Sequence, residues 1–238
     1  MLGSSTRSAV THRPHYSEMR IGIISESPTD LALASALLNR VAASRAGVQW
    51  PLQTDNTVER IGIRQGGHGQ VLKALKKLKK LLNDSPFSDY SLILVLVDRV
   101  PAALRKHFTK EVRGDDRFVL GIAIKEIEAW WLADRLNVLA WLQLTNEDIE
   151  DHRYGAPQYN SEQDEDPKCT LDEITNTSTA VGTRYGGGNL GLAREFSLLW
   201  KDSARLGQME LHCPEGFAPF CRDAERAFRR AVKRARNH

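Results

Sequence analysis

Apolar residues up to residue 145 alternate between short continuous runs and longer runs with helical spacing. Continuous runs predict buried strands at residues 20–25, 90–98 and 117–124, and a weaker run predicts a strand at 59–64. Helical spacing follows each of them and predicts helices at 29–41, at 70–82, from Pro101 onward and at 126–142. Strands and helices that alternate in this way form a mostly parallel sheet with helices on both faces. The pattern therefore predicts an α/β fold.

Beyond residue 145 this alternation is lost. Residues 147–166 contain eight acidic side chains together with Gly155, Pro157 and Asn160, a composition typical of a mobile insertion outside the core. Shorter or amphipathic helices are expected at 171–175, 190–200 and 217–236. We therefore expect a flexible tail at 1–18, an α/β core at 19–144, and an acidic insertion with a helical C-terminal appendage at 145–238.

Composition narrows the class of protein. Hydrophobic residues make up 41% and charged residues 26%, as in ordinary globular proteins. No apolar run approaches the ~20 residues that cross a bilayer, and the first eighteen residues lack the apolar centre of a secretory signal. Three cysteines without paired spacing argue against a disulfide framework and a structural zinc site. We expect a cytoplasmic protein with no membrane contact.

Acidic residues follow two of the predicted strands. Glu26 lies just beyond the first strand, Asp98 closes the central one, and Asp30 follows Glu26 by four residues. The carboxyl ends of parallel strands share one rim of the sheet, where ligands of such folds bind. Crowded carboxylates repel each other unless a cation neutralises them, and hard oxygen ligands suit Mg²⁺ or Mn²⁺. The sequence predicts a metal site suited to phosphoryl transfer.

Each of these residues also has a simpler interpretation. Asp30 is a good helix-starting residue, and Asp98 is also consistent with a polar strand end before a turn. Glu26 has the least obvious structural role, so the combination carries the prediction. Trp130, Trp131 and Leu132 are expected to pack their helix on the sheet, with base stacking as the alternative.

Several segments together resemble a known family. They are Glu26-Ser27-Pro28-Thr29-Asp30, Val97-Asp98, the block from Ile127 to Asp134, Asp166-Pro167-Lys168 and the block from Cys213 to Phe217. The chain resembles a TOPRIM-like (Rossmann-like) prokaryotic family of unknown function. Its members occur beside overcoming-lysogenization-defect or SMC-type ATPases in anti-phage loci. The resemblance implies an AAA or ABC-type ATPase as protein partner.

The resemblance also implies roles for particular residues. TOPRIM folds hold Mg²⁺ with a first-strand Glu and an Asp-x-Asp, and Glu26 and Asp98 match the first two of these acids. Val100 stands at the second Asp, so two-metal catalysis requires another carboxylate from Glu126, Glu128 or Asp134. If residues from Glu126 onward form one helix, Glu126 and Asp134 differ by about 80° in azimuth around its axis, and Glu128 points in another direction. These three acids therefore cannot all bind one ion. By resemblance, Lys168 stabilises charge on the phosphate.

Basic residues concentrate in two predicted helices. The lysines of the helix at 70–82 are typical of an ordinary solvated face, and they are Lys73, Lys76, Lys77, Lys79 and Lys80. The C-terminal helix is denser in basic residues, as is typical of phosphate contact, with docking to an acidic partner as the alternative. Its predicted nucleic-acid contacts are Arg226, Arg229, Arg230, Lys233 and Arg234. Gly66 to Gly69 is a weak phosphate-binding signal, and His68 within it is a weak candidate base.

Two functional hypotheses follow. The first is a Mg²⁺-dependent nuclease for DNA or RNA, the effector of an ATPase-controlled antiviral system. Its catalytic residues would be Glu26, Asp98 and Lys168, and its metal ligands would come from Glu26, Asp30, Asp98, Glu126 and Glu128. The second is a catalytically weak TOPRIM module that binds and regulates an ATPase, which Val100 favours. The sequence has no Walker-type loop, so ATP-driven switching must come from the partner.

Overall fold

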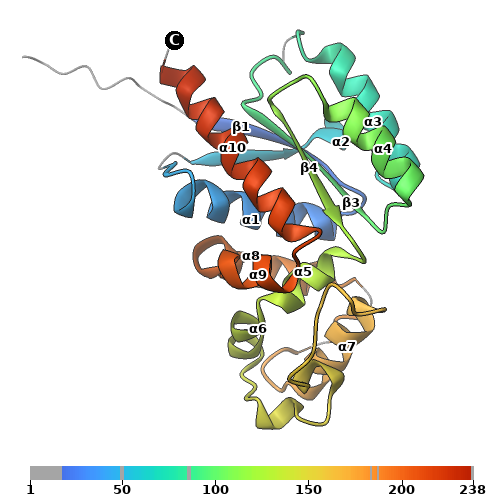
Figure 1. Cartoon of the computed structure of the whole chain (residues 1–238), viewed down its shortest axis with the longest axis vertical. Helices are drawn as coiled ribbons and strands as arrows, with labels where there is room; N and C mark the ends of the chain where they lie inside the picture. Colours follow the sequence, from blue (N-terminus) through green and yellow to red (C-terminus); the bar gives the residue numbers. More distant parts are fainter. Residues whose placement is uncertain (1–17, 49–50, 85–86, 183, 187, 237–238) are drawn as a thin grey trace, which may run out of the picture.

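The computed structural model describes residues 18–48, 51–84, 87–182, 184–186 and 188–236. Apart from Glu18, the expected tail at 1–18 lies outside these residues. Four parallel strands form one sheet in the order β2-β1-β3-β4 (Figure 1). They are β1 (Met19–Ile24), β2 (Leu52–Asn56), β3 (Leu92–Asp98) and β4 (Phe118–Ala123). The predicted α/β fold with a parallel sheet flanked by helices is confirmed.

Helices cover both faces of the sheet, and alternate residues of β3 point into two different clusters. One face is covered by α1 (Pro28–Ser44) and α10 (Phe217–Arg236). The other is covered by α2 (Thr57–Arg60), α3 (His68–Leu81) and α4 (Ala102–Val112). Because β3 is covered on both faces, all its residues except Asp98 are buried, which explains its continuous apolar sequence.

The remaining helices lie beyond the carboxyl ends of the strands or beside α1. They are α5 (Ile127–Ala133), α6 (Arg135–Leu142), α7 (Pro167–Thr177), α8 (Leu190–Ser203), α9 (Leu206–His212) and two short 3₁₀ helices, η1 (Glu147–Ile149) and η2 (Arg153–Gly155). Helix α8 packs along α1, and α5 follows β4 at the carboxyl rim (Figure 1). None of the helices in the described ranges is both long and apolar enough to span a membrane.

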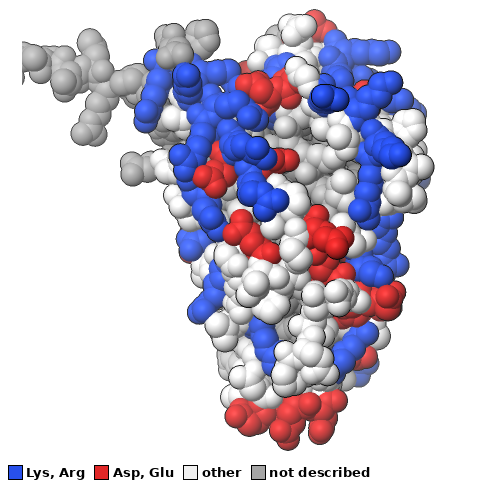
Figure 2. Space-filling model, in the orientation of Figure 1, with Lys and Arg blue, Asp and Glu red and all other residues white. Residues whose placement is uncertain are grey.

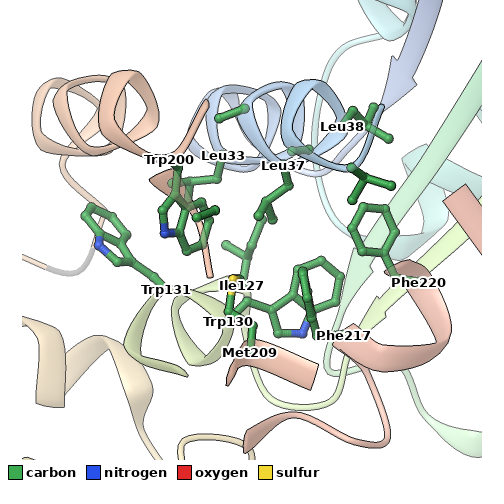
Figure 3. Close-up of a cluster of buried hydrophobic side chains, with 14 of the residues drawn as sticks. Leu33, Leu37, Leu38, Ile127, Trp130, Trp131, Trp200, Met209, Phe217 and Phe220 are labelled. Atoms are coloured by element: carbon green, nitrogen blue, oxygen red, sulfur yellow. The ribbon is translucent and has the colours of Figure 1, made fainter. Parts of the chain in front are cut away.

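Side chains from five helices join one buried cluster. Figure 3 shows Leu33, Leu37 and Leu38 of α1, Ile127, Trp130 and Trp131 of α5, Trp200 of α8, Met209 of α9, and Phe217 and Phe220 of α10. Trp130 and Trp131 are 1% and 0% exposed, so neither ring offers a face to a base. Their predicted packing role is confirmed, although they pack largely against other helices, and the base-stacking alternative is wrong.

The weakest predicted strand was wrong. Residues 59–64 form the end of α2 and a turn, and the second strand is β2. Ile61 and Ile63 alternate with polar residues as a strand would, but they are buried beneath α3 instead. As an edge strand paired only with β1, β2 has partly exposed side chains and so carries little apolar signal.

The single helix predicted at 126–142 is two helices. They meet at Asp134, whose Oδ2 accepts hydrogen bonds from Asn137 Nδ2 at 2.8 Å, Trp200 Nε1 at 2.9 Å and Arg205 N at 3.3 Å. Two of these donors come from distant parts of the chain. A tertiary hydrogen-bond network therefore stabilises the break, which helical periodicity could not reveal.

The acidic segment at 147–166 packs into the main core, contrary to our expectation. Ile149 and Tyr154 are fully buried, and the Tyr154 hydroxyl donates to the Leu132 carbonyl at 2.9 Å. The Glu162 carboxylate accepts from the Glu215 and Gly216 N–H groups at 2.8 and 2.6 Å, just before α10 begins. Helix α10 in turn lies on β4 and beside α1, so it belongs to the helical layer that covers the sheet.

Candidate functional site

The two acids predicted at the carboxyl rim meet. Strands β1 and β3 pair with Ile24 opposite Val95, so they end side by side. Glu26 follows β1 by two residues, and its Oε1 accepts a hydrogen bond from Asp98 N at 3.1 Å. The predicted proximity of Glu26 and Asp98 is confirmed, and it follows directly from the parallel pairing of their strands.

Asp30 combines a structural role with a place in the acidic cluster. It forms a capping box in which Asp30 N donates to Ser27 Oγ at 3.2 Å and Ser27 N donates to Asp30 Oδ2 at 2.9 Å. Burial raises the pKa of Asp30, and the nearby Glu26 charge raises it further, while Ser27 and Lys168 oppose the shift. The helix-starting interpretation is confirmed, and it does not remove Asp30 from the cluster.

Glu126 and Glu128 join the cluster from the start of α5. Glu126 Oε1 lies 3.1 Å from both Arg99 Nη2 and Lys168 Nζ. Glu128 Oε1 accepts a hydrogen bond from the Tyr185 hydroxyl at 2.5 Å. We expected Glu128 to face elsewhere, which is wrong because α5 begins at Ile127 and azimuths counted from Glu126 do not apply.

Asp134 lies outside this cluster. Its carboxylate is engaged by Asn137, Trp200 and Arg205 at the junction of α5 and α6. It is therefore a structural residue, and of the three acids considered as replacements for the second Asp, Glu126 and Glu128 remain.

Cationic and polar side chains surround the acids. The pKa of Lys168 is lowered by burial, but the charges of Glu128, Glu126 and Asp98 outweigh burial and raise it overall, so this ammonium stays protonated. His68 Nε2 lies 2.5 Å from the Asp98 carbonyl oxygen and 3.3 Å from Glu26 Oε1. The weak histidine signal in the glycine-rich turn was therefore informative, since the turn places His68 at the rim.

Sequence reasoning did not select Arg99 or Tyr185. Arg99 directly follows the strand-ending Asp98 and has a φ of 46°, a left-handed conformation that is strained for a residue with a side chain. Its position after Asp98 was a usable signal. Tyr185 reaches Glu128 from a segment 57 residues away, and no local pattern indicated it.

The acids raise one another's pKa values and leave several oxygens without donors. Burial raises the pKa of Asp98 well above its usual range, and the charges of Asp30, Glu128 and Glu26 add to this, while the Ile127 N–H opposes it. Burial also raises the pKa of Glu128 to about 7, although the charge of Lys168 and the hydrogen bond from Tyr185 act to lower it. Within the described part of the chain, Asp98 Oδ1, Glu126 Oε2 and Glu128 Oε2 are buried without a hydrogen-bond partner. A proton or a cation would relieve this arrangement.

The donor set fits a hard divalent cation, although no preformed cage is present. Among the residues that the structure describes, no group of three or more His, Cys, Asp or Glu side chains is arranged to hold a metal ion. Mg²⁺ commonly uses only one or two protein carboxylates and takes its other ligands from water and substrate phosphate. Partnerless oxygens on Asp98, Glu126 and Glu128 meet that smaller requirement.

Glu128 makes the stability of the metal-free protein depend on pH. Its folded pKa of about 7 exceeds its usual 4.5, so the folded protein holds a proton that the unfolded chain releases between these values. The free energy of unfolding should therefore fall as pH rises through this window, by up to about 3 kcal/mol. Thermal and urea melts in EDTA from pH 4.5 to 8 should show a shallower fall for Glu128→Gln. Identical pH slopes for both proteins would contradict the shift.

The residues predicted to bind nucleic acid lie elsewhere. On α10, Arg226 pairs with Asp223 and Arg229 with Glu225, while Arg230 and Arg234 both pair with Asp116; Lys233 is exposed on the same helix. Arg234 Nη2 also donates to the Ser91 carbonyl at 2.9 Å, just before β3.

The length of β3 separates this part of α10 from the acidic cluster. Seven residues of strand correspond to about 20 Å, so the basic end of α10 lies at the opposite rim of the sheet (Figures 1 and 2). The structure thus gathers Glu26, Asp30, Asp98, Glu126, Glu128 and Lys168 at one rim and does not bring the α10 arginines to them. Comparison of the chain with protein-family models, curated proteins and solved structures gives no match.

Proposed function

We propose that this protein is a TOPRIM-type nuclease that cleaves phosphodiester bonds in DNA or RNA with Mg²⁺ or Mn²⁺. One observation carries the proposal: Glu26 and Asp98 meet at the ends of adjacent parallel strands, among further acids with partnerless oxygens and beside Lys168. Such a cluster has excess negative charge at the rim where parallel sheets bind ligands. The resemblance of the surrounding segments to TOPRIM-like domains supports the same conclusion.

The side chains at the rim divide into metal-holding and phosphate-binding groups. Asp98, Glu126 and Glu128, with Glu26 and Asp30 beside them, would hold the cation. When bound, it would neutralise the acids and polarise a phosphate oxygen. Lys168 and Arg99 are 35% and 51% exposed in their side chains, so both can reach a phosphate that arrives from solvent.

Glu26 is the best candidate for a general base. Its side chain is 20% exposed, against 8% for that of Glu126. It can accept a proton from the attacking water, while the His68 imidazole, 3.3 Å away, orients its carboxylate. The new bond forms between the water oxygen and phosphorus, and the ester oxygen leaves from the opposite side and takes up a proton.

Val100 supports a second candidate, a catalytically weak TOPRIM module that binds and regulates an ATPase. It is 2% exposed and packs in the cluster that contains Val97 and Phe108, so the position of the second Asp offers no ligand. In the nuclease proposal Glu126 and Glu128 take this place. For both candidates, the resemblance to domains found beside ATPases in anti-phage loci supports a cytoplasmic AAA or ABC-type ATPase partner.

Cleavage assays distinguish the two candidates. Supercoiled plasmid and tRNA are incubated with wild type, Glu26→Gln or Glu150→Gln, in EDTA, Mg²⁺ or Mn²⁺, with and without an ATPase encoded by an adjacent gene. We expect cleavage only with metal, and a rate at least about 100-fold lower for Glu26→Gln. Glu150 is exposed and is not among the charges that act on Asp30, Asp98 or Glu128, so its variant should match wild type. Equal cleavage by both variants would remove the site assignment, and no cleavage under any condition would favour the binding module.

A further inference from the structure

Three lysines form an outward-facing stripe on α3. Lys73, Lys76 and Lys80 are exposed and lie opposite the buried side of the helix, which carries Val71, Ala74, Leu75 and Leu78. They extend over about 10 Å along the helix axis. No described residue forms an ion pair with any of the three, and α3 itself contains no acidic residue. The stripe is therefore a row of uncompensated positive charges.

A second stripe runs along the neighbouring helix α4. Lys106 and Lys110 are exposed on the side of α4 opposite the buried Phe108, and the exposed Arg113 follows directly as its C-cap. These three residues too have no ion-pair partner among the described residues. The two helices are joined by Lys79, whose Nζ donates to the Glu111 carbonyl at 2.6 Å and lies 3.6 Å from Glu111 Oε2. Figure 2 shows the resulting band of Lys and Arg side chains over α3 and α4. The two stripes together form what we term the α3–α4 basic face.

The α3–α4 basic face begins at the acidic cluster. Helix α3 starts at His68, which contacts the Asp98 carbonyl and Glu26, and α4 starts four residues after Asp98. Lys73 is five residues into α3, about 7.5 Å along its axis from His68. A chain of phosphates lying along this face would therefore lead directly to Glu26 and Asp98.

Helix α10 differs from this face chiefly in its position, although Arg222, Lys233 and Arg236 on it are also exposed without an ion pair among the described residues. Four of its arginines are paired with Asp223, Glu225 or Asp116, and its basic end lies at the far rim of the sheet. A phosphate that bound there would have to displace these carboxylates. The large hydrophobic side chains that are most exposed in the described ranges, Leu136, Leu198 and Leu211, are on α6, α8 and α9, so the α3–α4 basic face offers nothing to insert into a lipid bilayer.

We infer that the α3–α4 basic face binds the phosphate backbone of nucleic acid and guides it to the acidic cluster. This inference rests on the proposed function for its purpose, but binding can be measured without cleavage. Since contacts with the backbone are electrostatic, affinity should depend strongly on salt and weakly on sequence.

Matched charge-reversal variants test the inference. Fluorescence anisotropy measures binding of labelled duplex DNA, single-stranded DNA and RNA in EDTA over a range of NaCl concentrations. The test variant is Lys73→Glu/Lys76→Glu/Lys80→Glu on α3. The control is Arg222→Glu/Lys233→Glu/Arg236→Glu on α10, whose three residues are also exposed. Both variants change the net charge from +3 to −3, because each of three reversals subtracts two charges.

We expect the α3 variant to bind at least about tenfold more weakly than wild type. The slope of log affinity against log salt concentration should become shallower, by the equivalent of up to about three phosphate contacts. The α10 control should stay within about threefold of wild type. Equal weakening of both variants, weakening of the control alone, or no binding by wild type would overturn the inference. Poly-glutamate that competes as well as DNA at equal charge would also overturn it, because the surface would then suit an acidic protein.

A second variant covers the possibility that charge reversal disturbs folding. Lys73→Gln/Lys76→Gln/Lys80→Gln keeps exposed side chains of good helix propensity, and circular dichroism checks that it folds. It should bind at least about threefold more weakly than wild type, and unchanged affinity would contradict the inference. Binding without cleavage would leave the inference standing while the nuclease proposal fails. If the α3 variant cleaved with the KM of wild type, the nuclease proposal would stand and the inference would fail.

Discussion

Asp98→Asn is expected to abolish metal-dependent cleavage and, at the same time, to stabilise the metal-free protein. Burial and the charges of Asp30, Glu128 and Glu26 raise the pKa of Asp98, so ionising its carboxylate costs folding free energy. An asparagine removes that charge, and its amide can donate to a neighbouring acid where Asp98 Oδ1 has no described partner. It also loses a metal ligand, so we expect a fall in kcat/KM of at least about 100-fold.

The gain in stability should depend on pH in a definite direction. Because the folded pKa of Asp98 is raised, its charge destabilises the folded protein above that pKa and is absent when the carboxyl is protonated. We expect Asp98→Asn to raise the free energy of unfolding by about 1–3 kcal/mol at pH 8, and by less at pH 5. Urea melts in EDTA measure this, with the exposed Asp202→Asn as the control. A variant that is less stable than wild type at pH 8 would contradict the described cluster.

Trp131→Ala is expected to produce the largest loss of stability, about 3–5 kcal/mol, because it leaves a large cavity in the core. Trp131 is 0% exposed and stacks on Phe196 of α8 with ring centroids 4.7 Å apart and an interplanar angle of 20°. Its ring also meets Tyr185 edge to face at 5.4 Å. Loss of the indole therefore removes contacts with both α8 and the segment that carries Tyr185.

Urea denaturation measures the loss, and Leu198→Ala on α8 is the control. Leu198 is 74% exposed, so its truncation should change the free energy of unfolding by no more than about 0.5 kcal/mol. Trp131→Phe, which keeps an aromatic ring, should lose clearly less than Trp131→Ala. A loss below about 1 kcal/mol for Trp131→Ala would show that α5 and α8 do not pack as described. Because Tyr185 loses the packing of the Trp131 ring, its hydroxyl, which donates a hydrogen bond of 2.5 Å to Glu128, should also be less well positioned.

The part of the site that could be predicted is the part fixed by strand ends. β1 and β3 are recognisable because they are buried on both faces, so all their residues are apolar except Arg20 in β1 and Asp98 at the end of β3. Once two strands are parallel neighbours, the residues that follow them must emerge at one rim. Glu26 and Asp98 could thus be paired without any knowledge of side-chain packing. Lys168 entered the sequence prediction through resemblance alone, since nothing local marks it.

Other features depended on contacts between distant segments. The break at Asp134 is stabilised by Trp200 and the Arg205 backbone, which lie 66 and 71 residues away in the chain. α5 starts at Ile127, so Glu128 lies in its first turn at the rim, where Tyr185 meets it. β2 was missed because an edge strand needs few apolar residues. The pairing of Arg230 and Arg234 with Asp116 was not visible in the sequence, because Asp116 is remote along the chain.

By itself, the sequence determined the class of fold, three of the four strands and the rim at which the acids lie. These follow from hydrophobic periodicity and chain connectivity, which act over a few residues. Only the tertiary structure decided which acids share the rim, which of their oxygens lack a donor, and which basic helices have uncompensated charge. These depend on burial and on partners brought together from afar, and both exist only once the core has formed.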